Sequence, residues 1–175
     1  RGVLTIVPHF CLVPQEVRAQ VPSAAEMVFI KPPLFPDDQI NARIYAQNYG
    51  IAILPQIPCT PEMLVPPAPQ VPGVLAQIMS PHAFDTVTKT VQVVGSVNWP
   101  AGSANFFKVE IEGPQFPAWT TVGTTHNNPV DNGLLEQFGA EGLQPGVYKL
   151  RITIIGKDGG IMATSPEIPV TVTGQ

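Results

Sequence analysis

Apolar and polar residues alternate in several short stretches of the second half of the chain. Between residues 107 and 111 every second residue is apolar, and the residues between them are Lys108 and Glu110. Because successive side chains of a β-strand point to opposite faces of the sheet, this pattern predicts a strand with one buried and one wet face. We expect strands over residues 74–79, 91–97, 107–111, 118–125, 134–138, 148–154 and 167–173.

Glycine, proline and asparagine separate these predicted strands, at a spacing typical of an all-β fold. We therefore predict that residues 74–175 form an immunoglobulin-like or fibronectin-like β-sandwich, with a hairpin turn at residues 157–160. Leu143, Gly146 and Tyr148 have the spacing of a tyrosine corner, in which a buried tyrosine hydroxyl bonds an upstream backbone group. An ordinary tyrosine at the start of a strand is the alternative.

The first half of the chain is rich in proline and poor in glycine. Proline accounts for 21 of the 175 residues, which excludes a helical bundle because proline interrupts helices. Pro66, Pro67, Pro69 and Pro72, followed by Gly73, predict a stiff polyproline-type linker. We accordingly divide the chain into a Pro-rich extended segment, residues 1–73, and the sandwich, residues 74–175.

Short apolar runs predict strands within the Pro-rich segment, over residues 3–7, 26–30, 40–45 and 50–54. Prolines lie between them, so we expect this segment to be strand-poor. A segment with so little core of its own is expected to stay ordered by lying against the sandwich, an upstream domain or another subunit.

Composition narrows the function classes further. Charged residues make up 13% of the chain and hydrophobic residues 44%, which excludes a charge-rich disordered tail. The net charge is -4, so the chain lacks the positive charge that a protein needs to bind nucleic acid or an anionic membrane. No stretch reaches the roughly 18 apolar residues of a transmembrane helix. The sequence begins at Arg1 rather than Met, so we expect a processed form or a fragment.

The chain has two cysteines, Cys11 and Cys59, both in the Pro-rich segment. A disulfide between them would close a loop of roughly 48 residues and would stabilise the fold by about 3–4 kcal/mol in the loop-entropy model. Two buried free thiols are the alternative. We favour the disulfide, on the condition that the protein is exported.

Catalytic and metal-binding motifs are missing from the sequence. His9, His82 and His126 are scattered, and no pair of His or Cys has a ligand-like spacing, so we expect no metal and no cofactor. No Gly-x-Ser-x-Gly motif is present. Glu110 and Glu112 share one predicted strand face, where we expect a solubilising stripe rather than acid-base chemistry.

Four aromatic residues are candidates for a contact patch for glycan or protein: Trp99, Phe106, Phe116 and Trp119. Phe106 and Phe107 are consecutive, so on a strand one of them points outward. Phe116 and Trp119 flank Pro117, and Trp99 is expected in a loop. Aromatic residues that cap the core are the alternative.

A longer set of residues shares its order and spacing with a known family. The set comprises residues 91–97 and 106–112, Trp119, Pro129, Val130, Asn132, Gly133, Leu134, Leu135, Leu143, Gly146, Tyr148, Leu150 and Arg151. Residues 78–173 thereby resemble the C-terminal accessory region of bacterial class A penicillin-binding proteins, the peptidoglycan transglycosylase-transpeptidases. The family's catalytic Ser-x-x-Lys, Ser-x-Asn and Lys-Thr-Gly motifs are absent, so no catalytic residue is carried over. The resemblance implies a location outside the membrane and an accessory role.

The region before the sandwich is similar to the connector of those enzymes. The similarity rests on Glu26, Phe29, Ile30, Pro36, Asp37, Ile44, Gly50, Ala52, Cys59 and Pro61. The chain departs from the family at residues 31–33, where Lys-Pro-Pro replaces a Gly-Thr-x-Pro sequence, and it has fewer cysteines.

These observations favour a non-catalytic, exported cell-wall or cell-surface module for binding or spacing. Its expected partners are cell-wall glycan or other envelope proteins, not nucleic acid, and its expected location is extracellular or at the cell surface. The alternative is a structural subunit of an extracellular filament or surface assembly, held together by its N-terminal arm, which could add a strand to a neighbour's sheet. An enzyme is disfavoured because no constellation of residues supports one.

Overall fold

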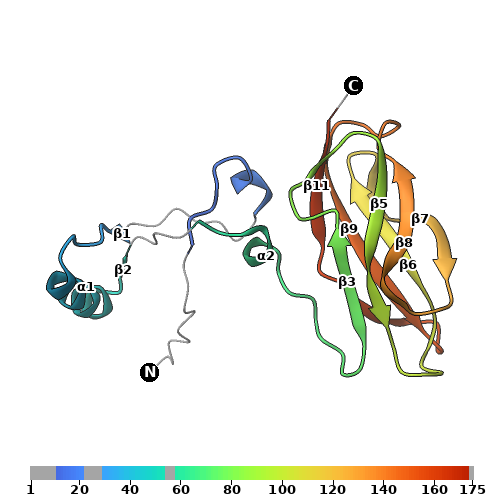
Figure 1. Ribbon diagram of the computed structural model, residues 1–175, viewed down its shortest axis with the longest axis horizontal. Helices are drawn as coiled ribbons and strands as arrows, with labels where there is room; N and C mark the ends of the chain where they lie inside the picture. Colours follow the sequence, from blue (N-terminus) through green and yellow to red (C-terminus); the bar gives the residue numbers. More distant parts are fainter. Residues whose placement is uncertain (1–10, 22–28, 54–57, 174–175) are drawn as a thin grey trace. The chain divides into compact units, whose positions relative to one another are not determined.

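The fold is described from a computed structural model, over residues 11–21, 29–53 and 58–173 (Figure 1). The chain divides into two compact units, Arg1–Thr60 and Pro61–Gln175. The boundary between the units lies after residue 60 in the sequence, whereas we placed it after residue 73. The short helix α2 (Pro61–Leu64) and the Pro-rich run, residues 66–73, belong to the second unit.

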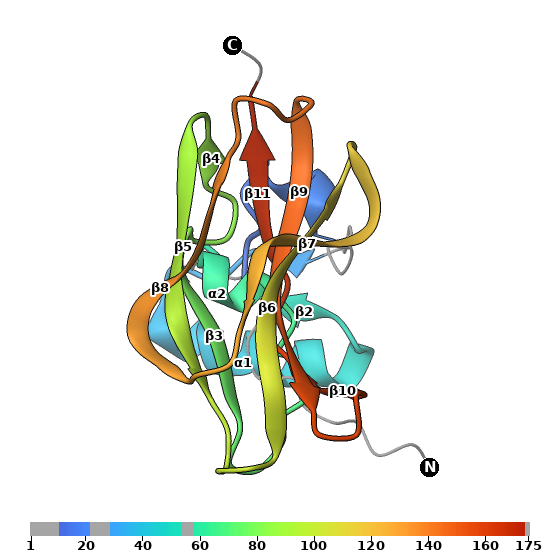
Figure 2. The same cartoon turned by 90° about the vertical axis from the view of Figure 1, so that its right-hand side faces the viewer.

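From Leu75 onward the second unit is an all-β sandwich, as the alternating pattern predicted. Its strands are β3 (Leu75–Ser80), β4 (Thr86–Val87), β5 (Thr90–Asn98), β6 (Ala104–Gly113), β7 (Phe116–His126), β8 (Val130–Gly139), β9 (Gly146–Gly156), β10 (Ile161–Thr164) and β11 (Ile168–Val172). A six-stranded sheet has the order β4-β11-β9-β6-β7, with β10 also paired to β9, and a three-stranded sheet has the order β3-β5-β8. Figure 2 shows the two sheets facing each other.

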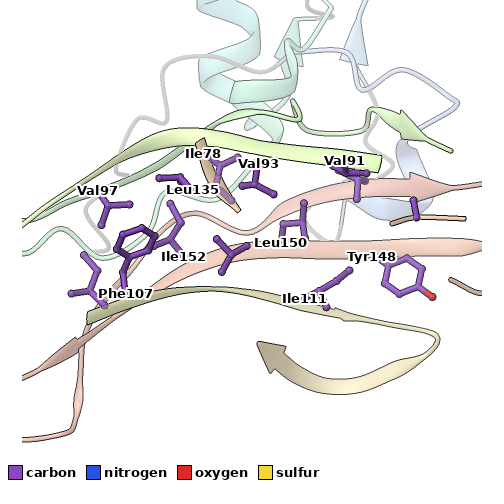
Figure 3. Packing of buried hydrophobic residues seen from close by; sticks show 14 of the residues in the cluster. Ile78, Val91, Val93, Val97, Phe107, Ile111, Leu135, Tyr148, Leu150 and Ile152 are labelled. Atoms are coloured by element: carbon purple, nitrogen blue, oxygen red, sulfur yellow. The ribbon is translucent and has the colours of Figure 1, made fainter. Parts of the chain in front are cut away.

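The core lies between the inner faces of the two sheets (Figure 3). Phe107 of β6 and Ile152 of β9 are fully buried and face Val93 and Val97 of β5 from the other sheet. Val109 of β6 is fully buried in the same cluster. Burying one such side chain contributes roughly 1.5–3 kcal/mol. Burial of the apolar side chains that alternate along the strands therefore contributes most of the stability of the sandwich. Each sheet covers the other, so no long helix is needed to cover either one.

The tyrosine at the start of β9 has the geometry that defines a tyrosine corner. Tyr148 is 0% exposed, and its hydroxyl donates a hydrogen bond to the backbone carbonyl of Gln144 at 2.9 Å. Leu143 packs beside the core, and Gly146 has φ +149°, a conformation that L side chains rarely adopt. Gly113 lies directly over the ring, since a Cβ placed there would be 2.3 Å from Cδ1 of Tyr148.

Two strands of the sandwich were not predicted. β4 has only two residues, and β10 follows the hairpin turn that we expected, in which the Gly156 amide donates to the Gly160 carbonyl at 2.9 Å. Neither strand carries a full alternating pattern of its own. Both form because a longer strand already offers an edge: β11 for β4, and β9 for β10.

The first unit contains a helix at a place where we predicted a strand. We predicted a strand over residues 40–45, but these residues lie in α1 (Pro36–Tyr49). Pro36 stands at the first helical turn. Gly50 closes the helix with φ +64°, and its amide donates a hydrogen bond to the Ala46 carbonyl, so both ends carry the residues that helix termini prefer. Ile40 and Ile44 fit a helix as well as a strand, because they are four residues apart.

The rest of the first unit is sparse in regular structure. A short 3-10 helix, η1 (Arg18–Gln20), precedes β1 (Phe29–Ile30), which pairs in parallel with β2 (Ala52–Ile53). These strands fall within the predicted runs at 26–30 and 50–54, whereas the run at 3–7 lies outside the described residues. None of the helices in the described parts of the chain is long and apolar enough to cross a membrane.

The predicted disulfide is confirmed within the first unit. Cys11 and Cys59 are joined across 48 positions of sequence. Next to the bridge, the Cys59 amide donates to the Leu12 carbonyl at 2.9 Å, and Leu12 pairs with Pro58 in an isolated β-bridge. The disulfide therefore fastens the two ends of a unit whose buried residues are few: Val21, Ala46 and Cys59 among those described.

We predict that Gly113→Ala destabilises the sandwich by about 1–3 kcal/mol, because the new methyl group overpacks the buried Tyr148 ring. Gly142→Ala is the matched control, since a Cβ at Gly142 meets nothing within 4 Å. It should change the free energy of unfolding by less than about 1 kcal/mol. Urea unfolding followed by tryptophan fluorescence measures both, and equal values for the two variants would contradict this account of the corner.

Candidate functional site

Charged and aromatic side chains gather on the outer face of the six-stranded sheet, the face turned away from the core. β6 and β9 are antiparallel, with Lys108 opposite Thr153 and Glu110 opposite Arg151. Because the residues between them face the core, these side chains point outward. We use "outer face" below for the following residues: Lys108, Glu110, Trp119, Lys149, Arg151, Thr153 and Glu167.

Glu110 is the centre of the outer face. Its carboxylate lies 2.7 Å from the Lys108 ammonium and 2.9 Å from the Arg151 guanidinium, and it accepts a 2.6 Å hydrogen bond from the Thr153 hydroxyl. The residue is 4% exposed. Our prediction of a wet stripe is therefore wrong for Glu110, because the longer side chains of Lys108 and Arg151 cover it.

The electrostatics of Glu110 follow from these contacts. Burial by itself raises the pKa of the Glu110 carboxyl, but hydrogen bonds from Lys108, Thr153 and Arg151 together outweigh it, so the pKa lies below its usual value. Glu110 is thus held ionised at neutral pH. A buried carboxylate with this many donors serves to fix its neighbours rather than to exchange protons.

Arg151 connects this network to an aromatic ring. Its guanidinium carbon lies 3.9 Å from the centroid of the Trp119 ring, a cation-π distance, while its Nε and Nη2 bond Glu110. Lys149 and Glu167 form a second, exposed ion pair at 2.9 Å. Trp119 is half-buried, so part of its ring remains at the surface in a fixed orientation.

A groove runs along one side of Arg151. It has a volume of about 270 Å³ and is bounded by the Pro-rich run and by the connection from β10 to β11. The lining residues are Pro66, Pro67, Ala68, Pro69, Arg151, Thr164, Ser165, Pro166 and Glu167. The groove offers pyrrolidine rings on one wall and charged and hydroxyl groups on the other.

The four aromatic residues of the predicted contact patch do not come together. Trp99 is 8% exposed and belongs to the core, with its ring centroid 6.2 Å from that of Phe107, so it is not an exposed contact residue. Phe116 is half-buried against the core. Phe106 is half-buried at the position of β6 opposite Ile155, and only Trp119 joins the charged network.

The Arg151 network was not found from the sequence. Its signal was present in the alternation of residues 107–111 and 148–154, since two such strands side by side must bring their outward residues into rows. Which strand neighbours which, and in what register, depends on the whole sandwich.

His126 and Glu136 form a second polar contact, between β7 and β8. The His126 Nε2 atom lies 3.3 Å from the Glu136 carboxylate, and its ring stacks on Phe107 at 5.0 Å between centroids. Burial raises the pKa of Glu136, but backbone amides of Thr124 and Gln137 and the His126 ring outweigh it and lower the pKa overall. Within the described residues, no group of three or more His, Cys, Asp or Glu is placed to hold a metal ion.

Comparison with known proteins gives a fold likeness and little else. No family model matches the chain, and no curated protein matches it. Among solved structures, fibronectin(III)-like modules of Clostridium thermocellum CbhA align over 56% of this chain and 94% of that one, at 20% identity and a TM-score of 0.38. An engineered protein aligns over 57% of this chain and 20% of its own length, at 16% identity and a TM-score of 0.35. The sandwich itself is established by the strand order, and no function follows from these likenesses.

We predict that Glu110→Gln removes part of the pH dependence of stability. A carboxyl whose pKa is lowered by folding stabilises the protein above its unfolded pKa of about 4.3, and this contribution is lost as the pH falls through the folded value. The variant should therefore be less stable than the wild type by about 1–3 kcal/mol at pH 7 and by much less at pH 3.

Urea unfolding at the two pH values measures this difference. Glu136 has a pKa shift of the same sign, but it is present in both proteins and cancels in the comparison. Glu141→Gln, an exposed position outside the network, is the control. If Glu110→Gln lowers the free energy of unfolding by as much at pH 3 as at pH 7, the lowered pKa of Glu110 is contradicted.

Proposed function

We propose that this chain is a non-catalytic, exported accessory module that binds cell-wall glycan through the outer face of its six-stranded sheet. The observation that carries the proposal is the fixed Trp119 ring, which Arg151 holds from one side while Glu110 holds Arg151. Such an arrangement orders a binding surface before the ligand arrives, so little conformational entropy is lost on binding.

The chemistry of the surface suits a sugar chain. Sugar rings present C–H groups on their flat faces and hydroxyl groups around the rim. An aromatic ring offers an apolar surface for the former, and the charged groups of Arg151, Lys149 and Glu167 on the outer face can donate to and accept from the latter. The adjoining groove extends this surface with Thr164 and Glu167.

Two further observations support an exported accessory role. The Cys11–Cys59 disulfide is typical of oxidising compartments outside the cytosol. The resemblance of residues 78–173 to the tail of class A penicillin-binding proteins provides the link to the cell wall. A spacing role is compatible with the same surface, since a module bound to the wall also sets a distance from it.

We predict that the chain co-sediments with purified peptidoglycan and that Trp119→Ala weakens binding about tenfold or more, the effect expected of a central aromatic contact. Tyr49→Ala is the matched control, because Tyr49 is an aromatic residue that is 66% exposed in the first unit. A wild-type chain that stays in the supernatant contradicts wall binding. If Trp119→Ala and Tyr49→Ala weaken peptidoglycan binding equally, the binding site is not on the outer face.

A second candidate function, a subunit of a surface assembly, is favoured by the first unit. α1 and the residues just before it expose large apolar side chains: Leu34 is 90% exposed, Phe35 68%, Ile40 62% and Tyr49 66%. Exposed apolar groups of this size are typical of surfaces that another chain covers. The second copy of this chain is the occupant that an assembly would supply.

We predict that, if the assembly function holds, the full chain elutes from a sizing column with a scattering mass above 18.7 kDa, and that Phe35→Ser with Ile40→Ser reduces it. Ile161→Ser, a 63% exposed apolar residue of the sandwich, is the control and should leave the mass unchanged. A wild-type mass of one chain would rule out this second function and leave the first one standing.

A further inference from the structure

The Pro-rich run of the second unit has a burial pattern with a period of three. Val65, Ala68, Val71 and Val74 are half-buried, and every residue between them is exposed. The exposed residues are Pro66, Pro67, Pro69, Gln70, Pro72 and Gly73. A polyproline II helix has three residues per turn, so this pattern identifies one inward row and two outward rows of such a helix.

The backbone contacts of the run agree with this conformation. Among the described residues, the backbone groups of residues 66–70 form no hydrogen bond with other backbone groups, as in polyproline II. The run ends at a turn in which the Val74 amide donates to the Val71 carbonyl at 3.0 Å and Gly73 has φ +75°. With Pro72 before this glycine, the turn is type II, whose second residue keeps polyproline-like dihedral angles.

The outward rows form a continuous ridge. Pro66, Pro69 and Pro72 are spaced three residues apart, and at about 3.1 Å per residue they span roughly 19 Å. The ridge contains no charged residue, and the carbonyl groups of residues 66–70 accept no backbone hydrogen bond from the described part of the chain, which leaves them as acceptors for a partner. It lies within the second unit, where it runs back beside β3 (Figure 1).

We propose that this ridge, residues 66–72, is a docking site for a protein partner whose binding groove is lined with aromatic side chains. Such grooves accept pyrrolidine rings from successive turns of polyproline II, and their tyrosine hydroxyl or tryptophan N–H groups donate to its free carbonyls. The ridge is held in the bound conformation by its inward row, so the entropy cost of binding is small.

Strand addition is excluded as the mode of docking, because four of the seven residues of the ridge are proline and lack the amide hydrogen that a sheet requires. An anionic lipid surface is disfavoured by the missing positive charge. The proposal does not rest on glycan binding, because Trp119 takes no part in it, although Pro66, Pro67 and Pro69 also line the groove beside Arg151.

A WW domain, which binds polyproline II helices in a groove lined with aromatic rings, serves as the probe for this docking site. Titrating it into the ¹⁵N-labelled full chain should give saturable shift changes at the amides of Gln70, Val71 and Gly73 and their neighbours. Pro69→Ala should weaken binding about tenfold, a loss of about 1.4 kcal/mol. Pro129→Ala, an exposed proline before β8, should leave binding unchanged.

Gln70→Pro keeps the test decisive if Pro69→Ala also disturbs the fold of the run. The Gln70 amide bonds no other backbone group, so proline fits there and extends the ridge. It should bind at least as tightly as the wild type. Absence of saturable binding, equal affinities of Pro69→Ala and Pro129→Ala, or shift changes on the outer face instead of the ridge would each overturn the proposal.

Discussion

The register of β6 against β9 is the constraint on which both faces of the six-stranded sheet depend. Phe107, Val109 and Ile152 must face the other sheet, since their burial drives folding. The pleat then turns the alternate residues outward, and the same register places Glu110 opposite Arg151. A shift of one residue would expose the core residues and bury the charged ones, so the apolar core and the outer face are selected together.

The two units reach order by different physical means. The sandwich has a continuous apolar core to which both sheets contribute, whereas the described part of the first unit buries few side chains. A cross-link raises the free energy of the unfolded chain by limiting its conformations, and it therefore compensates for a small core. The disulfide thus stabilises the first unit, as the hydrophobic core stabilises the second.

Two properties of proline, its missing amide hydrogen and its fixed φ, explain the conformation of the Pro-rich run. Without an amide hydrogen, proline cannot extend the sheet of β3, so the run can lie next to the sandwich without becoming a strand of it. A groove of about 650 Å³ separates the run from β3 and β10. The fixed φ of proline also holds the run extended, and the outward pyrrolidine rings remain available to a partner.

The sequence was sufficient to predict the all-β sandwich, through alternation and the turn residues between strands, and the buried side of β6 and β9, through alternation. The spacing of Leu143, Gly146 and Tyr148 indicated the tyrosine corner. All of these features depend on neighbours within one strand or turn. Spacing and composition also favoured the disulfide. The helix α1 was missed because Ile40 and Ile44 satisfy two periodicities, and the terminal signals at Pro36 and Gly50 decide between them. The burial of Glu110 and Trp99, and the meeting of Arg151 with Trp119, were decided only by the tertiary structure, since each depends on which strands are neighbours and which side chains then cover one another.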